Sequence, residues 1–225
     1  MARINRETVA DMALAALRSD ILERRLEPGE PLREEAVAKD LGISRATVRE
    51  VFKTLLAEGL LARNASTRVL EVTHLNADDV REIYHARRFL ELAGVDAARR
   101  ATPEQLAELA AIMQEMAKAV AADDPLALVD ADTRCHETIV GFLGSRYLSQ
   151  LHRTMMTRLR LAMSRIEQDV ARDNEAVYEA HQTFCDQLLS GDFDMAARNL
   201  EERLRASEEL ILNHEGLPDR QKLSL

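Results

Sequence analysis

Residues 32–59, LREEAVAKDLGISRATVREVFKTLLAEG, decide the fold of the N-terminal part of this chain. Apolar residues recur at helical spacing up to Leu41, and a second apolar series begins with Val48. Gly42 can adopt the positive φ that ends a helix, and Ser44 can cap the next helix by accepting a hydrogen bond from a backbone N–H. The stretch therefore predicts two short helices joined by a tight turn, a helix-turn-helix.

The second of these helices has a polar face in addition to its apolar stripe. Arg45, Thr47, Arg49 and Lys53 lie away from the stripe, and the two arginines stand one turn apart. The first turn of a recognition helix enters the major groove of DNA, where arginine can bind O6 and N7 of guanine bidentately. An alternative interpretation is a solvated charged face on an ordinary helix pair. The Gly turn, the cap and the first-turn arginines together favour DNA binding.

Residues 17–63, from LRSDIL to EGLLAR, closely resemble the winged-helix N-terminal domain of the GntR family. The shared pattern includes L-x-PG-x-x-L-x-E, then LG-I-SR-x-x-VRE, and finally L-x-x-EGL. The resemblance implies a small two-stranded wing after the helix-turn-helix, and it implies DNA contact by a group of five residues, Arg33, Ser44, Arg45, Thr47 and Arg49. Where the family usually has a glycine at the wing tip, this chain reads ARNASTRVLEV at residues 62–72. We expect Asn64 to supply the turn and Arg68 to reach a minor groove or a phosphate.

Charge and length indicate how the chain is organised. At 225 residues the chain suits two domains, and 46% hydrophobic residues suffice for a core. The net charge is −9, but residues 1–72 hold 12 basic and 12 acidic side chains, whereas the remainder holds 18 and 27. A neutral DNA-binding domain should have weak, salt-dependent non-specific affinity. Two copies on two half-sites would compensate, so the sequence predicts a homodimer.

The chain contains neither a run of eighteen apolar residues nor an apolar leader with a cleavage site. We therefore expect a cytoplasmic protein without a membrane partner. Cys135 and Cys185 give no disulfide framework, which agrees with a reducing compartment, and both are expected to be small buried residues.

The pattern changes from strand to helix near residue 73. We predict a mainly α protein, with a winged helix-turn-helix at 1–72, a linker at 73–80, an all-α antiparallel bundle at 81–214 and a flexible tail at 215–225. Caps and helix breakers divide the bundle into six helices, with expected limits near residues 77–97, 102–122, 124–144, 145–166, 173–190 and 192–213.

Three segments of the bundle carry a second resemblance. Residues 87–109, 130–139 and 179–204 are similar to the all-helical effector-binding domain, called FCD, that follows the winged helix in the FadR subfamily of GntR regulators. Six helices in this length resemble the shorter, VanR-like branch. The resemblance implies a small-molecule site within the bundle, and it therefore covers nearly the whole chain.

Asp132 and His136 stand four residues apart, which places both on one face of a helix, and His181 on a later helix could converge on them. In the FCD domain an Asp and a His with this spacing, a His on a later helix and a third His twenty-two residues further on hold a metal ion. The position of that third His is Arg203 here. Arginine cannot ligate a cation and its charge repels one, so we expect no required metal.

With no metal required, Arg203 would hold the carboxylate of an anionic effector. The alternative is a divalent ion such as zinc on Asp132, His136 and His181. Arg87 matches the pocket arginine of the family; its alternative role is an exposed partner of Glu91 at i+4.

These observations together predict a ligand-responsive, dimeric transcriptional regulator, most simply a repressor, that binds a pseudo-palindromic operator in double-stranded DNA. A small anionic metabolite, a carboxylic acid, would release it. The competing interpretation is a helical metal-dependent enzyme, or a metal-sensing regulator, that uses the Asp132, His136 and His181 cluster. The sequence shows no evident nucleophile or catalytic base with an orienting partner, so we predict that the protein is not an enzyme.

Overall fold

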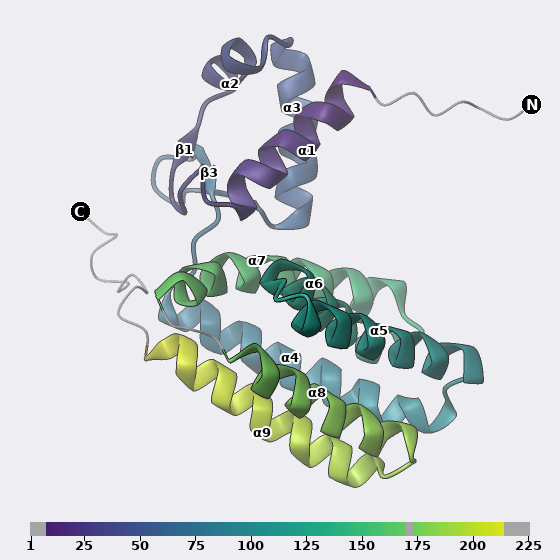
Figure 1. Cartoon of the computed structure of the whole chain (residues 1–225). Helices are drawn as coiled ribbons and strands as arrows, with labels where there is room; N and C mark the ends of the chain where they lie inside the picture. The colour runs from purple at the N-terminus through teal and green to yellow at the C-terminus, as the bar shows by residue number, and fades with distance from the viewer. Residues whose placement is uncertain (1–7, 170–172, 214–225) are drawn as a thin grey trace, which may run out of the picture. The chain divides into compact units, whose positions relative to one another are not determined.

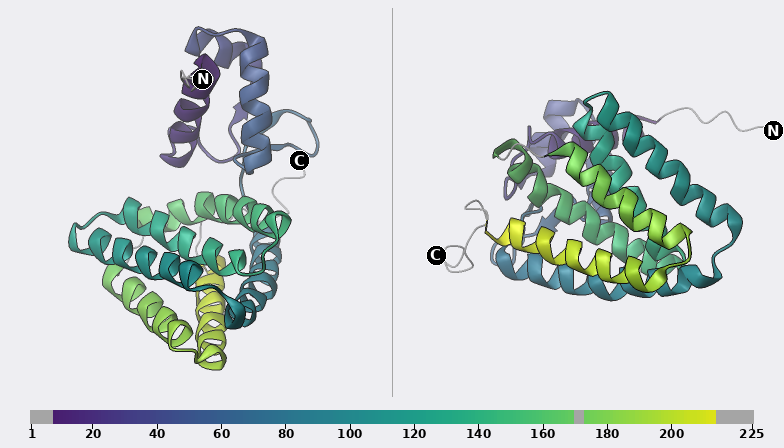
Figure 2. Two further views of the ribbon diagram at one scale, coloured as in Figure 1. Left: turned by 90° about the vertical axis from the view of Figure 1, so that its right-hand side faces the viewer. Right: turned by 60° about the horizontal axis from the view of Figure 1, so that its bottom comes forward.

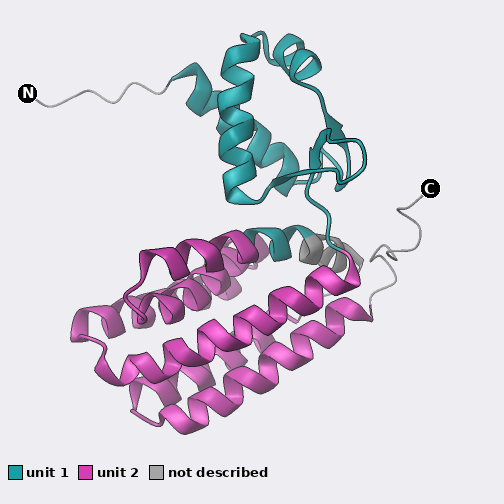
Figure 3. Cartoon of the chain, turned by 180° about the vertical axis from the view of Figure 1, so that it is seen from behind, with its two compact units in different colours: residues 1–75, 157–164 teal, residues 76–156, 165–225 magenta. Residues whose placement is uncertain are grey.

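The computed structural model describes residues 8–169 and 173–213, and the chain divides into two compact units (Figure 3). The first comprises residues 1–75 together with 157–164, and the second comprises 76–156 together with 165–225. The mainly helical architecture predicted from the sequence, a winged helix-turn-helix followed by a helical bundle, is confirmed (Figure 1). The expected tail at 215–225 lies outside the described residues.

Three helices and a small sheet form the first unit: α1 (Val9–Leu22), α2 (Glu34–Leu41) and α3 (Arg45–Glu58). Gly42 ends α2 with φ 64°, and the Ser44 side chain caps α3 by accepting from the backbone N–H of Thr47 at 3.1 Å. Helix α1 packs along α3, and the core between them is made of Leu17, Ile21, Val48, Phe52 and Leu55. The apolar periodicity of the sequence thus places the opposite face of α3 in solvent.

The sheet has three strands in the order β1-β3-β2, all antiparallel: β1 (Pro31–Leu32), β2 (Leu61–Arg63) and β3 (Leu70–Val72). The two wing strands, β2 and β3, were predicted. The sequence analysis missed β1 because a two-residue strand has no periodicity to detect. It is fixed instead by its pairing with β3, in which Leu32 faces Leu70.

Asn64 organises the wing turn, as expected. Its Oδ1 accepts from the backbone N–H groups of Ser66 and Thr67, both at 3.0 Å, and its Nδ2 donates to Glu71. Arg68 adopts the left-handed conformation, φ 61°, that a glycine provides in many turns.

The six predicted helices of the second unit are all present, together with a short 3-10 turn, Ala98–Arg100: α4 (Ala77–Ala97), α5 (Pro103–Ala121), α6 (Pro125–Gly141), α7 (Arg146–Asp169), α8 (Asn174–Leu189) and α9 (Phe193–Leu212). Because α4 begins at Ala77, residues 77–80 of the expected linker are helical. Side-chain caps fix the beginnings of five of these helices, from Asn76, Thr102, Asp124, Asp173 and Asp192.

Helices α4 and α9 lie side by side, as Figures 1 and 2 show, and α5 packs on α6 and α8. The interior holds large apolar side chains that are 0–1% exposed, among them Tyr84, Leu109, Met116, Leu128, Ile139 and Phe184. Within the described residues, no helix combines the length and the apolar character that a membrane crossing requires.

Gly94 permits the close approach of α4 to α6. A Cβ at this position would lie 2.3 Å from the backbone oxygen of Ile139, and that oxygen belongs to a helix that cannot yield locally. We expect Gly94→Ala to lower the free energy of unfolding by about 1–3 kcal/mol or more, because the two helices must separate. Denaturant titration followed by circular dichroism measures this loss.

Gly141, on α6, is the matched control, since an added Cβ there meets nothing within 4 Å. Gly141→Ala should be neutral or stabilising by up to about 1 kcal/mol, as expected for glycine in a helix. Equal effects of the two substitutions would contradict the assigned helix contact.

Candidate functional sites

The first turn of α3 presents the side chains that the sequence assigned to DNA. Ser44 and Arg45 are exposed, Thr47 is half-buried, and the hydroxyls of Ser44 and Thr47 lie 2.8 Å apart. The structure gives Arg45 no ion-pair partner within the described residues. Its guanidinium is therefore available to a ligand at the beginning of a helix whose unpaired N–H groups favour anions.

Arg49 differs from Arg45 because it is already paired. Its Nε donates to the Glu34 carboxylate of α2 at 2.8 Å, and the Arg49 side chain stays 56% exposed. The sequence did not predict this pair, since the two residues are brought together only by the turn between the helices. An exposed ion pair contributes about 0–1 kcal/mol, so a phosphate or a guanine edge can replace Glu34 at small cost.

The two remaining assigned arginines lie elsewhere on the unit. Arg33 is exposed directly before α2, and Arg68 is exposed in the wing turn. The structure therefore groups Ser44, Arg45, Thr47 and Arg49 on one helix end and places Arg33 and Arg68 on separate segments.

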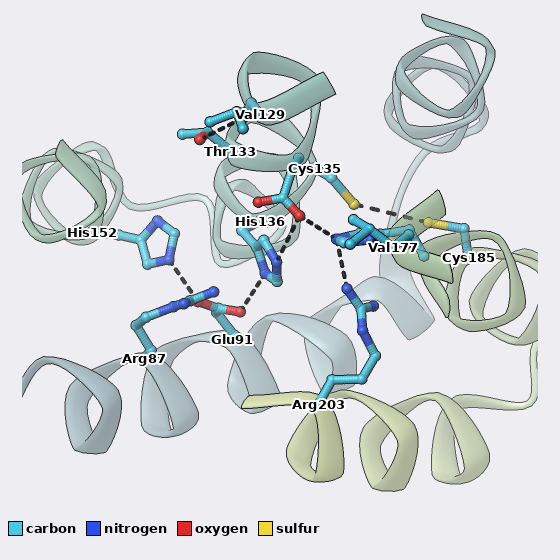
Figure 4. A network of polar contacts seen from close by, with 12 residues as sticks. Arg87, Glu91, Val129, Thr133, Cys135, His136, His152, Val177, Cys185 and Arg203 are labelled. Carbon is cyan, nitrogen blue, oxygen red and sulfur yellow. Dashed lines mark hydrogen bonds and ion pairs between the residues drawn. The ribbon is translucent and has the colours of Figure 1, made fainter. Parts of the chain in front are cut away.

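A buried polar cluster lies inside the second unit (Figure 4). At its base Glu91 of α4, 0% exposed, accepts from Arg87 Nε at 2.7 Å, His136 Nδ1 at 2.7 Å and His152 Nε2 at 2.9 Å. Burial opposes ionisation, but the charge of Arg87 and the hydrogen bonds from the two histidines outweigh it and hold the pKa of Glu91 well below its ordinary range. Glu91 is therefore a carboxylate that joins α4, α6 and α7.

The upper part of the cluster contains the residues that the sequence singled out. One ligand atom from each of Asp132, His136 and His181 lies within 4.8 Å of the others. The Nε2 atom of His181 is 2.6 Å from Asp132 Oδ1, and the Nε2 atom of His136 is 4.0 Å from the same oxygen. The fold thus brings a helix pair, α6 and α8, together around these side chains.

Hydrogen bonds fix the orientation of both imidazoles. His136 Nδ1 faces Glu91, and His181 Nδ1 faces the backbone oxygen of Val177 at 2.8 Å. Because a carboxylate or a carbonyl oxygen can only accept, each Nδ1 carries the proton, and in neutral rings both Nε2 atoms have lone pairs. This second-layer arrangement is common around metal-bound histidines.

Arg203 of α9 reaches the same place. Its Nη2 lies 2.6 Å from His181 Nε2 and donates to that lone pair (Figure 4), while its Nη1 is buried and has no hydrogen-bond partner in the described structure. Burial lowers the pKa of the Arg203 guanidinium and the Asp132 charge opposes the shift, but arginine stays protonated at neutral pH. A permanent cation thus touches one of the three metal-type ligands.

The donor set consequently fits a metal in one respect and opposes it in another. Two imidazole lone pairs and a carboxylate suit zinc or a similar ion. The Arg203 guanidinium occupies one of these lone pairs and adds a positive charge where a cation would lie.

Arg87 is placed differently from both of its sequence interpretations. It pairs with Glu91 at i+4, but the pair is buried, with side chains 5% and 0% exposed, rather than on the surface. The Arg87 guanidinium also lies over the ring of Tyr84, 5.1 Å from its centroid. Arg87 is therefore held beneath the cluster by Glu91.

Sequence reasoning missed Glu91 and His152 as parts of this site. The Arg87 spacing signalled Glu91 only as a surface partner, and nothing in the local pattern marked His152, which meets Glu91 across 61 residues. Tyr84 was also missed; its hydroxyl is buried without a partner in the described structure, and burial raises its pKa.

The two cysteines lie in the core next to the cluster. Their Sγ atoms are 3.9 Å apart, and the side chains are 0% and 1% exposed. Contact with the Cys185 thiol, together with burial, raises the pKa of Cys135 well above its ordinary value. Protonated, buried thiols are poor metal ligands, which agrees with the expected apolar role of Cys185.

A separate depression of about 440 Å³ lies between α5, α6 and α7. Its charged groups already pair across it, Arg134 with Glu115 and Arg153 with Glu137. The buried cluster, in contrast, retains an unpaired donor in Arg203.

The environment of His136 predicts a pH dependence of stability. Burial lowers the pKa of His136 although the Glu91 carboxylate opposes the shift. The unfolded chain therefore binds this proton more readily, so stability is complete above about pH 6.5 and is lost as the pH falls through the lower folded pKa. We expect urea midpoints to be constant above that pH and to fall below it.

Exposed His85 provides the comparison for this pH profile. His85→Gln should leave the profile unchanged, whereas a profile that is flat from pH 7 to 5 in the unmodified protein would show that His136 is not buried in its neutral form.

Comparison with known proteins agrees with both units. The family described as "Bacterial regulatory proteins, gntR family" matches residues 9–69, and the FCD domain matches residues 82–206. A probable D-xylose utilization operon transcriptional repressor from Paenarthrobacter nicotinovorans is 28% identical over 207 residues, which cover 91% of this chain and 89% of that protein.

Two further similarities agree. An uncharacterized HTH-type transcriptional regulator from Bacillus subtilis (strain 168) is 31% identical over 137 residues, 60% of this chain and 61% of that protein, less than two thirds of its length. The structure of a GntR transcriptional regulator from Rhodococcus sp. RHA1 is similar with a TM-score of 0.75 and 26% identity, covering 90% of this chain and 97% of the other. The competing interpretation as an enzyme is therefore set aside, and the chain belongs to the GntR family of bacterial regulatory proteins, in the FadR subfamily that carries a C-terminal FCD domain.

Proposed function

We propose that the protein is a ligand-responsive repressor that binds a pseudo-palindromic operator as a homodimer and is released by a small organic acid. The observation that carries the DNA-binding part is the exposed Arg45 guanidinium in the first turn of the capped helix α3. The similar D-xylose operon repressor supports the sign of regulation. Two half-sites would supply the affinity that a neutral DNA-binding unit lacks.

In this proposal the contacts divide into two classes. Arg45 and Arg49 read base edges, with Arg49 exchanging its Glu34 partner for DNA. The other assigned side chains, Arg33, Ser44, Thr47 and Arg68, bind phosphates or the minor groove and set the register.

Alanine substitution of the two reading arginines tests the proposal. Arg45→Ala and Arg49→Ala should each weaken operator binding by about 1–3 kcal/mol and relax sequence preference, because a bidentate contact to guanine is lost. The operator would be selected from a randomised duplex library, and fluorescence anisotropy at fixed salt measures the affinity.

Arg205→Ala is the charge-matched control, since Arg205 is an exposed arginine of α9. It should leave operator binding unchanged. Unaltered affinity and selectivity in both the Arg45 and Arg49 variants would refute the assigned recognition helix.

The effector part of the proposal rests on the buried cluster. Arg203 would bind the carboxylate of the acid, next to Asp132, His136 and His181, and Arg87 would support the site through Glu91. No metal is required, because the Arg203 guanidinium supplies the positive charge. Acid binding changes DNA affinity only if it favours one arrangement of the protein over another.

A second candidate is a metal-sensing regulator. The three convergent ligand atoms and the lone pairs on both Nε2 atoms favour it. The charge and position of Arg203 oppose it, and metal binding to an Arg203 variant separates the two candidates, as argued below.

A further inference from the structure

The buried cluster contains an acceptor that lacks a donor. Its Nδ1–H is given to Glu91, so the neutral His136 ring offers only the lone pair of Nε2 toward the upper cluster. The neighbouring Asp132 oxygen, 4.0 Å away, is itself an acceptor and too distant for a hydrogen bond. A buried acceptor of this kind is normally satisfied.

The cluster also contains a donor that lacks an acceptor. Arg203 uses Nη2 for the lone pair of His181, whose own proton is fixed on Nδ1 by the Val177 carbonyl. Nη1 of the same guanidinium is buried and has no partner in the described structure. An unpaired arginine nitrogen suits a carboxylate oxygen.

These two needs arise in one small volume. The three ligand atoms of Asp132, His136 and His181 lie within 4.8 Å, and Arg203 touches His181 at 2.6 Å. One compact molecule can therefore meet both, if an acceptor and a donor stand on adjacent atoms of it.

Building on the proposed function, we infer that the effector is an acid that carries a hydroxyl or ammonium group on the carbon next to its carboxylate. The carboxylate binds Nη1 of Arg203. The adjacent group donates to Nε2 of His136 on the side where Asp132 contributes negative charge.

A plain carboxylic acid satisfies only half of this site. It leaves the lone pair of His136 without a donor and gives Asp132 no positive or donor group to face. The loss of one buried hydrogen bond lowers affinity by about ten-fold, and this factor sets the expected selectivity. A hydroxyl and an ammonium group share the required chemistry; the ammonium group also gains from the Asp132 charge.

Matched acids test the inference on the full-length protein by titration calorimetry. The three-carbon series is propionate, lactate and alanine, and the four-carbon series is succinate, malate and aspartate. In at least one series we expect the hydroxy or amino member to bind about ten-fold or more tightly than the unsubstituted acid. The arm that wins identifies the donor.

His136→Asn is the diagnostic variant. The asparagine amide can still donate to Glu91 from the place of Nδ1 but has no atom in the place of Nε2, so the fold is supported while the acceptor is lost. Binding of the favoured acid should fall to the level of its unsubstituted analogue. Nitrogen-15 spectra of the histidine rings should independently show both His136 and His181 as Nδ1–H tautomers.

Equal binding of substituted and unsubstituted acids, or no binding by any of the six, would overturn the inference. So would Nε2–H tautomers. Operator binding without any acid is measured in parallel, so a failure of acid selectivity in a protein that still binds its operator leaves the DNA-binding proposal standing. Selective acid binding that never alters operator affinity would reject ligand-responsive repression and keep the site.

Discussion

Removal of the Glu91 carboxylate is expected to lower the free energy of unfolding by about 3–5 kcal/mol, the cost of leaving a buried charge without its partner. In Glu91→Ala the Arg87 guanidinium, 5% exposed, would lose its counter-charge. His136 and His152 would lose their common acceptor as well. Urea unfolding monitored by circular dichroism measures the change.

The Glu201–Arg205 pair of α9 gives a control with the same i,i+4 spacing. Its side chains are 39% and 66% exposed, so Glu201→Ala should cost no more than about 1 kcal/mol. If Glu91→Ala cost no more than Glu201→Ala, Glu91 would not be the junction that joins α4 to α6 and α7.

Arg203→His is expected to convert the buried cluster into a metal site. The substitution replaces a fixed positive charge by an imidazole beside Asp132, His136 and His181, which makes four ligands of the type that bind zinc. Removing a charge about 4 Å from a cation contributes on the order of 4 kcal/mol at an effective dielectric of 20, about a thousand-fold in affinity. Zinc should therefore raise the melting temperature of the variant far more than that of the unmodified protein.

Arg203→Gln separates the two causes, because it removes the charge without adding a ligand. We expect its zinc affinity to lie between those of the unmodified protein and Arg203→His. Elemental analysis after chelator treatment gives the stoichiometry. If the unmodified protein retained one zinc per chain as firmly as Arg203→His, the idea that the guanidinium takes the place of the ion would be wrong, and the metal-sensing candidate would replace it.

The DNA-reading unit was predictable because its signals are local. Gly42, Ser44 and the apolar series of α3 act within one or two helical turns, and the same short-range rules predicted the caps of the bundle helices. The β1 strand and the Arg49–Glu34 pair escaped prediction because each depends on a partner brought near by a turn.

The buried cluster was predictable only in part. The i,i+4 spacing placed Asp132 and His136 on one helix face, and the resemblance to the FCD domain added His181 and Arg203. Glu91 and His152 came from the structure alone, since their contact links α4 to α7 and neither helix shows it in its own periodicity.

By itself, the sequence determined the order of helices, the capped helix that presents Arg45, and the presence of an arginine where relatives of this domain have a metal-binding histidine. Only the tertiary structure decided what those side chains touch: that Glu91 is buried beneath three donors, that both imidazoles direct their lone pairs into the cluster, and that Arg203 keeps one nitrogen unpaired. The physical reason is range. Helix formation and capping depend on neighbours within a few residues, whereas proton placement on a buried ring depends on which distant acceptor the fold packs against it.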